Sequence, residues 1–274
     1  LFQSWGSITI INPLEKIWNG YSDTRMGASM DSYLNGYNDP RLPVYFQPVT
    51  EGDNKGEYRG VANGMPNPQQ DDYKAMSAPN VQEKSTDSPL RWMMASEVAF
   101  LRAEGAMRGW TAEMGGTAEE FYNKGIELSF LENGLSADAA ARYAADETSK
   151  PTDFTDVSAA NTKYNISALG KITIKWNAGA SEEEQLERII TQKWIAMFPN
   201  GTEAWSEFRR TGYPLIFPVR SNYPTSGVDT NKQIRRMVFP QSEYSNNGAA
   251  VQEAVKLLGG PDNGGTKLWW DKKN

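Results

Sequence analysis

The sequence predicts a mainly α-helical protein, built from tetratricopeptide-like helical hairpins with long irregular loops. Two stretches, 89–133 and 181–212, carry apolar residues at three- and four-residue steps on both sides of a turn sequence. The segments around them are rich in Gly, Pro, Asn and Asp, which favour turns and loops. A long insertion separates the two hairpins, so a contiguous array of repeats of about 34 residues does not fit. We expect residues 1–274 to form a single domain.

Helical periodicity in the first ninety residues is confined to one short segment. Ser22 or Asp23 can cap a helix there, and Asn35-Gly36 ends it. Residues 44–46 form a short apolar run that favours an extended conformation. Residues 49–87 are a long irregular excursion interspersed with aromatic residues. Structureless loops longer than about 15 residues are uncommon in compact domains and are often functional.

The first hairpin has clear start and stop signals. Ser88-Pro89 is expected to open its first helix, because proline lacks only an N–H that would be unpaired there. Small side chains on that helix predict that it is buried between other helices; they are Ala95, Ala99, Ala103 and Ala106. Thr117 caps the second helix, and Asn133-Gly134 ends it.

The region between the hairpins is less regular. Residues 137–145 are expected to be helical, and 146–167 form a polar loop. Residues 171–176, KITIKW, alternate as a short strand would. Near the end of the chain, residues 251–258 predict a short helix.

The second hairpin has the strongest helical signal. Ser181 and Glu184 have the spacing of a capping box. An apolar stripe follows, made of Leu186, Ile189, Ile190, Trp194 and Met197. Residues 199–201 form a turn, and Gly212 lies just past the second helix. Four tryptophans in periodic or terminal contexts are expected in the core: Trp92, Trp194, Trp205 and Trp269.

Composition excludes several classes of chemistry. The net charge is -6, from 28 Lys and Arg against 34 Asp and Glu, which argues against nucleic-acid binding. The chain has no Cys and no His, so thiolate nucleophiles, disulfides, Cys/His zinc sites and imidazole triads are excluded. Carboxylates, Lys, Tyr, Ser, Thr and oxygen-ligand metals such as calcium remain. No apolar run approaches the length needed to cross a bilayer.

Four stretches, in this order, resemble the carboxy-terminal half of the SusD/RagB family of outer-membrane nutrient-binding lipoproteins. They are 21–41 (YSDTRMGASMDSYLNGYNDPR), 94–109 (MASEVAFLRAEGAMRG), 183–213 (which includes ERIITQKWIAMF) and 235–247 (RRMVFPQSEYSNN). The resemblance spans nearly the whole chain. It implies a SusD-like helical fold, and we expect the amino-terminal portion with its lipid anchor to be absent from this sequence.

The resemblance also implies a function without catalysis. Such a protein captures a glycan or oligopeptide at the cell surface and delivers it to a SusC-like TonB-dependent transporter. It is a surface-exposed lipoprotein of the outer membrane, and the absent anchor is its only membrane contact. One alternative is a helical-repeat protein–protein scaffold without a small ligand. Another is a glycoside hydrolase, although no sequence feature singles out a carboxylate pair.

Aromatic residues in the loops are the candidates for ligand binding. Sugar rings stack on aromatic faces while neighbouring polar groups bind their hydroxyls. The candidates are Trp18, Tyr45, Phe46, Tyr58 and Tyr73. No catalytic residue is predicted, because Glu207 to Arg210 has the form of a charge pair near a helix end. Residues 259–265 are interpreted as a turn.

No cofactor is expected, although calcium remains possible. Acidic residues occur at Asp71-Asp72, Asp153, Asp156 and Asp262, without the spacing of a calcium-binding loop.

Overall fold

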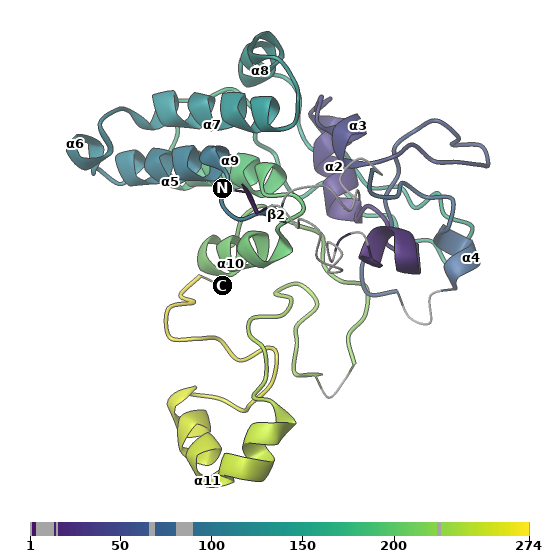
Figure 1. Cartoon of the computed structure of the whole chain (residues 1–274), viewed down its shortest axis with the longest axis vertical. Helices are drawn as coiled ribbons and strands as arrows, with labels where there is room; N and C mark the ends of the chain where they lie inside the picture. Colours follow the sequence, from purple (N-terminus) through teal and green to yellow (C-terminus); the bar gives the residue numbers. More distant parts are fainter. Residues whose placement is uncertain are drawn as a thin grey trace.

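The computed structural model describes residues 2–3, 14, 16–65, 69–80, 90–223 and 226–273. They form a mainly helical structure with long loops, which confirms the predicted fold class (Figure 1). The helices are the π-helix η1 (Lys16–Tyr21), α2 (Ala28–Gly36), α3 (Leu42–Tyr45), α4 (Gln70–Tyr73), α5 (Ala95–Met107), α6 (Thr111–Met114), α7 (Ala118–Glu132), α8 (Ala137–Ala144), α9 (Glu182–Ala196), α10 (Gly201–Thr211) and α11 (Gln241–Leu257). Two short strands, β1 (Phe2–Gln3) and β2 (Leu90–Arg91), pair antiparallel. No helix in these described ranges has the length and apolar character to span a membrane.

Helices α5, α7 and α9 form a packed layer, with α10 folded back against α9 (Figure 1). Ala99, Ala103 and Ala106 of α5 are buried as expected, whereas Ala95 is exposed. The close approach of α5 and α7 requires Gly125, because a Cβ there would lie 2.7 Å from the Phe100 ring. The small residues therefore set the distance between the helices.

The predicted helix ends agree with the structure in most cases. Thr117 and Glu120 form a complete capping box at the start of α7. At α9, the Ser181 hydroxyl accepts a hydrogen bond from the Glu184 N–H. Gly212 ends α10 with φ of 78°, a left-handed conformation that favours glycine. Local hydrogen bonding fixes these ends, so sequence reveals them.

Residues 171–176 do not form the predicted strand. The Tyr37 hydroxyl donates to the Ile172 carbonyl at 3.2 Å, and the Tyr122 hydroxyl donates to the Ile174 carbonyl at 2.5 Å. The Lys175 N–H donates to the Asp146 carbonyl. The side chains of Tyr37, which follows α2, and of Tyr122 in α7 thus satisfy backbone groups that a neighbouring strand would otherwise pair.

Several other predictions were wrong. Residues 42–45 form the helix α3, with Pro43 in its first turn, so the extended interpretation of 44–46 is wrong for Val44 and Tyr45 and right for Phe46. Helix α5 begins at Ala95 rather than at Ser88-Pro89, and these two residues lie outside the described ranges. Trp92 and Trp269 are 63% and 82% exposed instead of buried, because neither lies on the apolar face of a helix.

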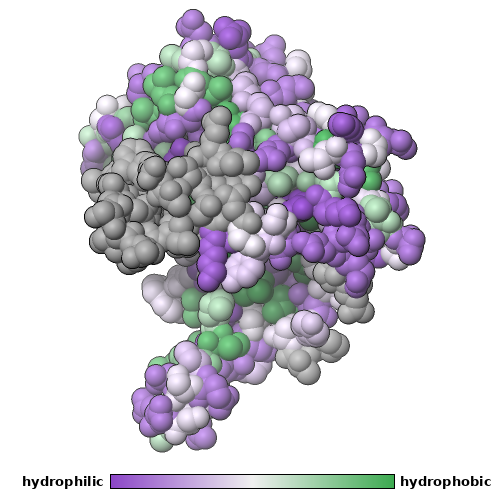
Figure 2. Space-filling view, turned by 45° about the vertical axis from the view of Figure 1, so that its right-hand side comes forward, coloured by the Kyte–Doolittle hydropathy of each residue, from purple (hydrophilic) through white to green (hydrophobic). Residues whose placement is uncertain are grey.

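Helix α11 is longer than the predicted 251–258 and stands apart from the helical layer (Figure 1). Its only buried residue is Val251, and Asn247 interrupts its helical geometry. Figure 2 shows mostly hydrophilic residues on α11 and hydrophobic ones where the chain leaves the body. On the segment leading to α11, Ile234, Met237 and Val238 are exposed.

Candidate functional site

A pocket of about 430 Å³ lies between the end of η1 and α4. In Figure 1, η1 is the dark purple helix beside α4. The pocket is lined by Tyr21, Asp23, Arg25, Gln69, Gln70, Tyr73 and Lys74. Two aromatic rings, two amides and three charged groups therefore meet in one cavity, which we call the tyrosine pocket.

Arg25 holds the two walls of the tyrosine pocket together. On its own wall it donates to the carbonyls of Ser22 at 3.0 Å and Thr24 at 2.8 Å. On the opposite wall it donates to the carbonyls of Tyr73 at 3.1 Å and Lys74 at 2.7 Å. Burial lowers the pKa of Arg25, and the nearby Asp23 carboxylate opposes that effect. Arg25 therefore acts as a structural tie.

Four other side chains of the tyrosine pocket have surface that is accessible to a ligand: Tyr21, Asp23, Gln70 and Tyr73. Tyr21 is 60% exposed, and Tyr73 is half-buried. Asp23 and Gln70 are exposed, so a carboxylate and an amide can bind hydroxyl groups. Burial raises the pKa of Tyr73, with further contributions from Asp156 and Asp72, so its hydroxyl stays protonated at neutral pH. This combination of ring faces and hydrogen-bonding groups suits a sugar chain.

Of the five predicted ligand-binding residues, the structure brings only Tyr73 into this pocket. Trp18, Tyr45 and Phe46 are 6%, 2% and 2% exposed, so their rings lie largely in the core, and their role in binding stays a prediction. All three pack around Phe198: the Trp18 ring is parallel to it, and the Tyr45 and Phe46 centroids each lie 4.9 Å away. Phe198, which follows the last residue of α9 by two positions, thus buries these three rings, and no sequence spacing indicates that contact.

Trp18 and Phe46 do line a second cavity, of about 320 Å³, which shares Arg25 with the tyrosine pocket. Its walls are mostly apolar and include Trp194 and Phe198. Tyr58 lines neither cavity and packs half-buried against the core. Its role in binding stays a prediction.

Tyr21 was missed by the sequence reasoning. It follows Gly20 and precedes Ser22 and Asp23, a turn-forming context that exposes an aromatic side chain. The same criterion of an aromatic residue among turn formers could have found it. Its partner wall, however, comes from residues 69–74, and no sequence spacing joins the two segments.

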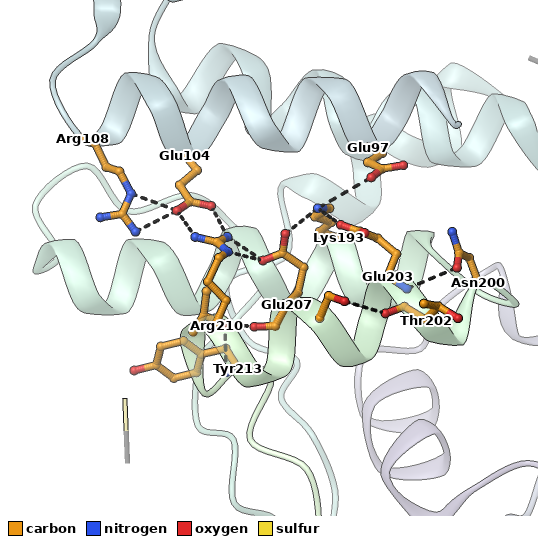
Figure 3. Close-up of polar contacts among 12 residues, drawn as sticks. Glu97, Glu104, Arg108, Lys193, Asn200, Thr202, Glu203, Glu207, Arg210 and Tyr213 are labelled. Atoms are coloured by element: carbon orange, nitrogen blue, oxygen red, sulfur yellow. Dashed lines mark hydrogen bonds and ion pairs between the residues drawn. The ribbon is translucent and has the colours of Figure 1, made fainter. Parts of the chain in front are cut away.

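The second region with concentrated charge is a buried ion network in the helical layer (Figure 3). The Lys193 ammonium lies 2.8 Å from Glu203 and 2.7 Å from Glu207. Arg210 binds both oxygens of Glu104, each at 2.6 Å, and also contacts Glu207. The network joins α5, α9 and α10, which confirms that Glu207 and Arg210 form a structural charge pair.

In the ion network, the pKa of each charged group depends on its burial and on its ion-pair partners. Burial alone would lower the pKa of Lys193, but Glu207 and Glu203 raise it. Burial alone would raise the pKa of Glu104, but hydrogen bonds from Arg210 and Arg108 lower it. Burial raises the pKa of Glu97, whose carboxylate lies 3.9 Å from Lys193. These charges stabilise one another through their ion pairs.

Three of the acidic residues considered for calcium accept hydrogen bonds from the protein. Asp153 accepts from the Ala168 N–H, and Asp156 accepts from the Ser158 hydroxyl and N–H. Asp262 accepts from Arg236 and from the Tyr244 hydroxyl. In the part of the chain that the structure covers, no three acidic residues are grouped closely enough to hold a metal ion.

Comparison with known proteins identifies the fold. The sequence profile of a family described as SusD-like, Susd and RagB outer membrane lipoprotein, matches residues 2–271. A chitin-binding SusD homologue from Flavobacterium johnsoniae is 42% identical with a TM-score of 0.88, covering 98% of this chain and 54% of that one. A SusD homologue from Bacteroides vulgatus is 38% identical with a TM-score of 0.89, covering 97% and 53%. A SusD-like protein from Bacteroides thetaiotaomicron is 43% identical with a TM-score of 0.87, covering 96% and 54%.

The chain spans about half the length of these solved relatives. Among curated proteins, no sequence matches it. The profile match covers well over half of the chain, and the structural matches agree with its helical, tetratricopeptide-like architecture. The chain therefore belongs to the SusD-like family of outer-membrane lipoproteins.

Proposed function

We propose that this chain binds a glycan at the cell surface through the tyrosine pocket, without chemical conversion of the ligand. The observation that carries the proposal is the presence of Tyr21, Tyr73, Asp23 and Gln70 around one cavity. Its volume of about 430 Å³ lies within the range of about 300–1,000 Å³ typical of small-ligand sites. The tyrosine rings would stack on sugar faces, while the carboxylate and amide bind hydroxyls.

The relatives support a glycan as the ligand, because one of them is described as chitin-binding. Membership of the family supports a site on the outer membrane and delivery of the glycan to a SusC-like TonB-dependent transporter. An oligopeptide is the second ligand class that such a pocket could hold. We also propose that binding needs no metal, so a chelator should leave the melting temperature unchanged.

Isothermal titration against neutral polysaccharides, including chitin oligosaccharides, and against peptides tests the proposal. We expect heat with at least one glycan. The double variant Tyr21→Ala/Tyr73→Ala should weaken binding at least about tenfold, since each aromatic contact contributes about 1 kcal/mol. Tyr223→Ala is the matched control, because Tyr223 is 87% exposed and lies outside the pocket.

The outcomes separate the proposed function from its alternatives. Absence of heat with every glycan and peptide would favour a protein–protein scaffold. Release of reducing ends from a bound polysaccharide would establish a hydrolase instead. If Tyr223→Ala lost as much affinity as the Tyr21→Ala/Tyr73→Ala double variant, the effect would not be specific to the tyrosine pocket, and the proposal would fail.

A further inference from the structure

Helix α5 is apolar on two sides, and the structure covers only one of them. On the covered side, Phe100 and Ala103 are buried in the core that α5 shares with α7 and α9. On the opposite side, Ala95, Val98 and Leu101 are exposed at three-residue steps, and Val98 and Leu101 are each 40% exposed. A helix that is apolar all round is ordinarily buried all round.

The charges of α5 are arranged in the reverse of a solvent-facing helix. Both of its carboxylates point to the covered side, where Glu97 lies 3.9 Å from Lys193 of α9 and Glu104 contacts Arg210 of α10 at 2.6 Å. A surface helix normally turns its charged residues outward and its apolar residues inward. The outer side of α5 is therefore built for contact with another apolar surface.

Helix α7 extends this exposed apolar surface. Leu131 is 47% exposed, and Phe121 and Leu128 on the same side of α7 are half-buried. The Arg102 guanidinium, one turn after Val98, lies 3.9 Å from the centre of the Phe121 ring, so the outer sides of the two helices adjoin. Figure 1 shows α5 and α7 side by side at the edge of the helical layer. We call this surface the α5–α7 face; it consists of Ala95, Val98, Leu101, Phe121, Leu128 and Leu131.

The length of the solved relatives indicates what covers the α5–α7 face. The alignment with the Flavobacterium johnsoniae homologue covers 98% of this chain and only 54% of that one, so the homologue has a further portion of similar length. In tetratricopeptide-like proteins, a helical hairpin cannot bury its apolar surface alone and stacks on a neighbouring hairpin. Helices α5 and α7 form such a hairpin.

We propose that the α5–α7 face is the docking surface for a helical hairpin from the portion of a SusD-like protein that this chain does not cover. Val98, Leu101 and Leu131 would insert between the side chains of the incoming helices, and the small Ala95 would allow their close approach. The proposal is separate from glycan binding, because neither the tyrosine pocket nor the second cavity is lined by residues of α5 or α7.

Co-expression tests this docking. The full chain, carrying an affinity tag, would be produced together with the uncovered portion of the Flavobacterium johnsoniae homologue as a separate polypeptide. The two should co-purify and elute as a 1:1 complex in size-exclusion chromatography. The double variant Val98→Asp/Leu101→Asp should reduce the co-purified fraction at least about tenfold, because docking would bury two unpaired carboxylates.

The matched control is Val238→Asp/Leu257→Asp, which makes the same two changes outside the α5–α7 face. Val238 and Leu257 are 51% and 88% exposed, and this variant should co-purify like the parent chain. Thermal unfolding followed by circular dichroism checks that each variant remains folded. If the double variant on α5 loses its cooperative transition, Leu131→Asp tests the same face from α7 and should also reduce co-purification.

The other occupants of the α5–α7 face are distinguished by the same variants. Failure of the parent chain to co-purify, or an equal loss in the Val238→Asp/Leu257→Asp control, would overturn the proposal. A dimer of the parent chain alone that dissociates in Val98→Asp/Leu101→Asp would assign the face to a second copy and would also overturn it. Glycan affinity should stay within about twofold of the parent value in the folded variants, since distant sites act independently. Loss of docking with retained glycan binding therefore supports this proposal without testing the tyrosine pocket.

Discussion

The ion network and the tyrosine pocket use charged side chains in opposite ways. In the ion network, Lys193 is 1% exposed and has three carboxylates around it, from Glu97, Glu203 and Glu207. In the pocket, Asp23 is exposed and open to a ligand. A buried charge without a partner is strongly destabilising, so the helical layer must pair its charges internally. A surface charge is stabilised by water and can stay unpaired until a ligand arrives.

This difference indicates where function can reside in the molecule. In the helical layer, the charged side chains of the ion network pair with one another and hold α5, α9 and α10 together (Figure 3). The loops of the first eighty residues use Arg25 for the same purpose and leave Asp23, Tyr21 and Tyr73 accessible. Mutations in the two regions should therefore separate stability from binding.

The largest effect is expected from Lys193→Ala. Removing the ammonium leaves Glu203 and Glu207 facing each other in a buried site, and breaking such a pair costs about 3–5 kcal/mol. Urea denaturation should show this loss of unfolding free energy. Lys256→Ala is the control, because Lys256 and Glu253 form an exposed pair whose loss should change stability by less than about 1 kcal/mol. Similar losses in both variants would contradict the distinction between paired interior and surface charges.

Within the ion network, two carboxylates should respond to pH with opposite signs. The pKa of Glu104 is lowered in the folded state, so its contribution to stability is present above the unfolded pKa near 4.5 and is lost at lower pH. The pKa of Glu97 is raised, so its ionisation reduces stability as the pH rises above that value.

The corresponding variants are Glu104→Gln and Glu97→Gln, measured by denaturation between pH 4 and pH 7. Relative to the parent chain, Glu104→Gln should lose more stability at pH 7 than at pH 4, by about 2 kcal/mol. The unfolding free energy of Glu97→Gln, relative to the parent chain, should instead be higher at pH 7 than at pH 4. If the relative stability of both variants changed in the same direction between pH 4 and pH 7, the pKa values of Glu104 and Glu97 would not be shifted in opposite directions.

In the tyrosine pocket, Arg25→Ala should affect binding more than stability. It removes four hydrogen bonds to surface carbonyls, which water can replace, so the expected loss of unfolding free energy is about 1 kcal/mol. The walls carrying Tyr21 and Tyr73 would no longer be joined, and glycan affinity should fall about tenfold or more. Titration and denaturation of the same variant give both quantities, and an unchanged affinity would count against Arg25 as the tie.

The smallest effect concerns Asp146, in the loop after α8. Burial would raise its pKa, but hydrogen bonds from Ser149 and Thr148 lower it to about 2. Because the folded pKa lies below the unfolded value of 3.8, this contribution is present above pH 4 and is lost between about pH 4 and pH 2. Asp146→Asn should cost about 1 kcal/mol or less at pH 7, since solvent screens this site. A stability difference that stays the same at pH 2.5 would contradict the assignment.

Local rules predicted the parts of the fold that depend on neighbouring residues. The cap at Thr117, the Ser181 half of the predicted capping box and the left-handed Gly212 all involve partners within four residues. The failures were tertiary in origin. Residues 171–176 alternate like a strand, yet the hydroxyls of Tyr37 and Tyr122 donate to two of their carbonyls.

The candidate site was predicted only in part, for the same reason. An aromatic residue in a loop can face solvent or the core, and the choice depends on what packs against it. Phe198 buries Trp18, Tyr45 and Phe46, although it follows them by about 150 residues or more in the chain. Tyr73, at the end of the short helix α4, is half-buried and lines the pocket, and its role in binding stays a prediction.

The sequence by itself determined the helical class, most of the helix ends and the absence of thiol and imidazole chemistry, because these depend on composition and on contacts within one or two turns. The tertiary structure alone decided which aromatic rings are buried and which carboxylates are paired. It also decided that residues 21–25 and 69–74 enclose one pocket, since Arg25 joins them across 48 and 49 positions of the chain. Long-range contacts of this kind carry no local sequence signal, because any exposed carbonyl can accept a guanidinium that the fold brings to it.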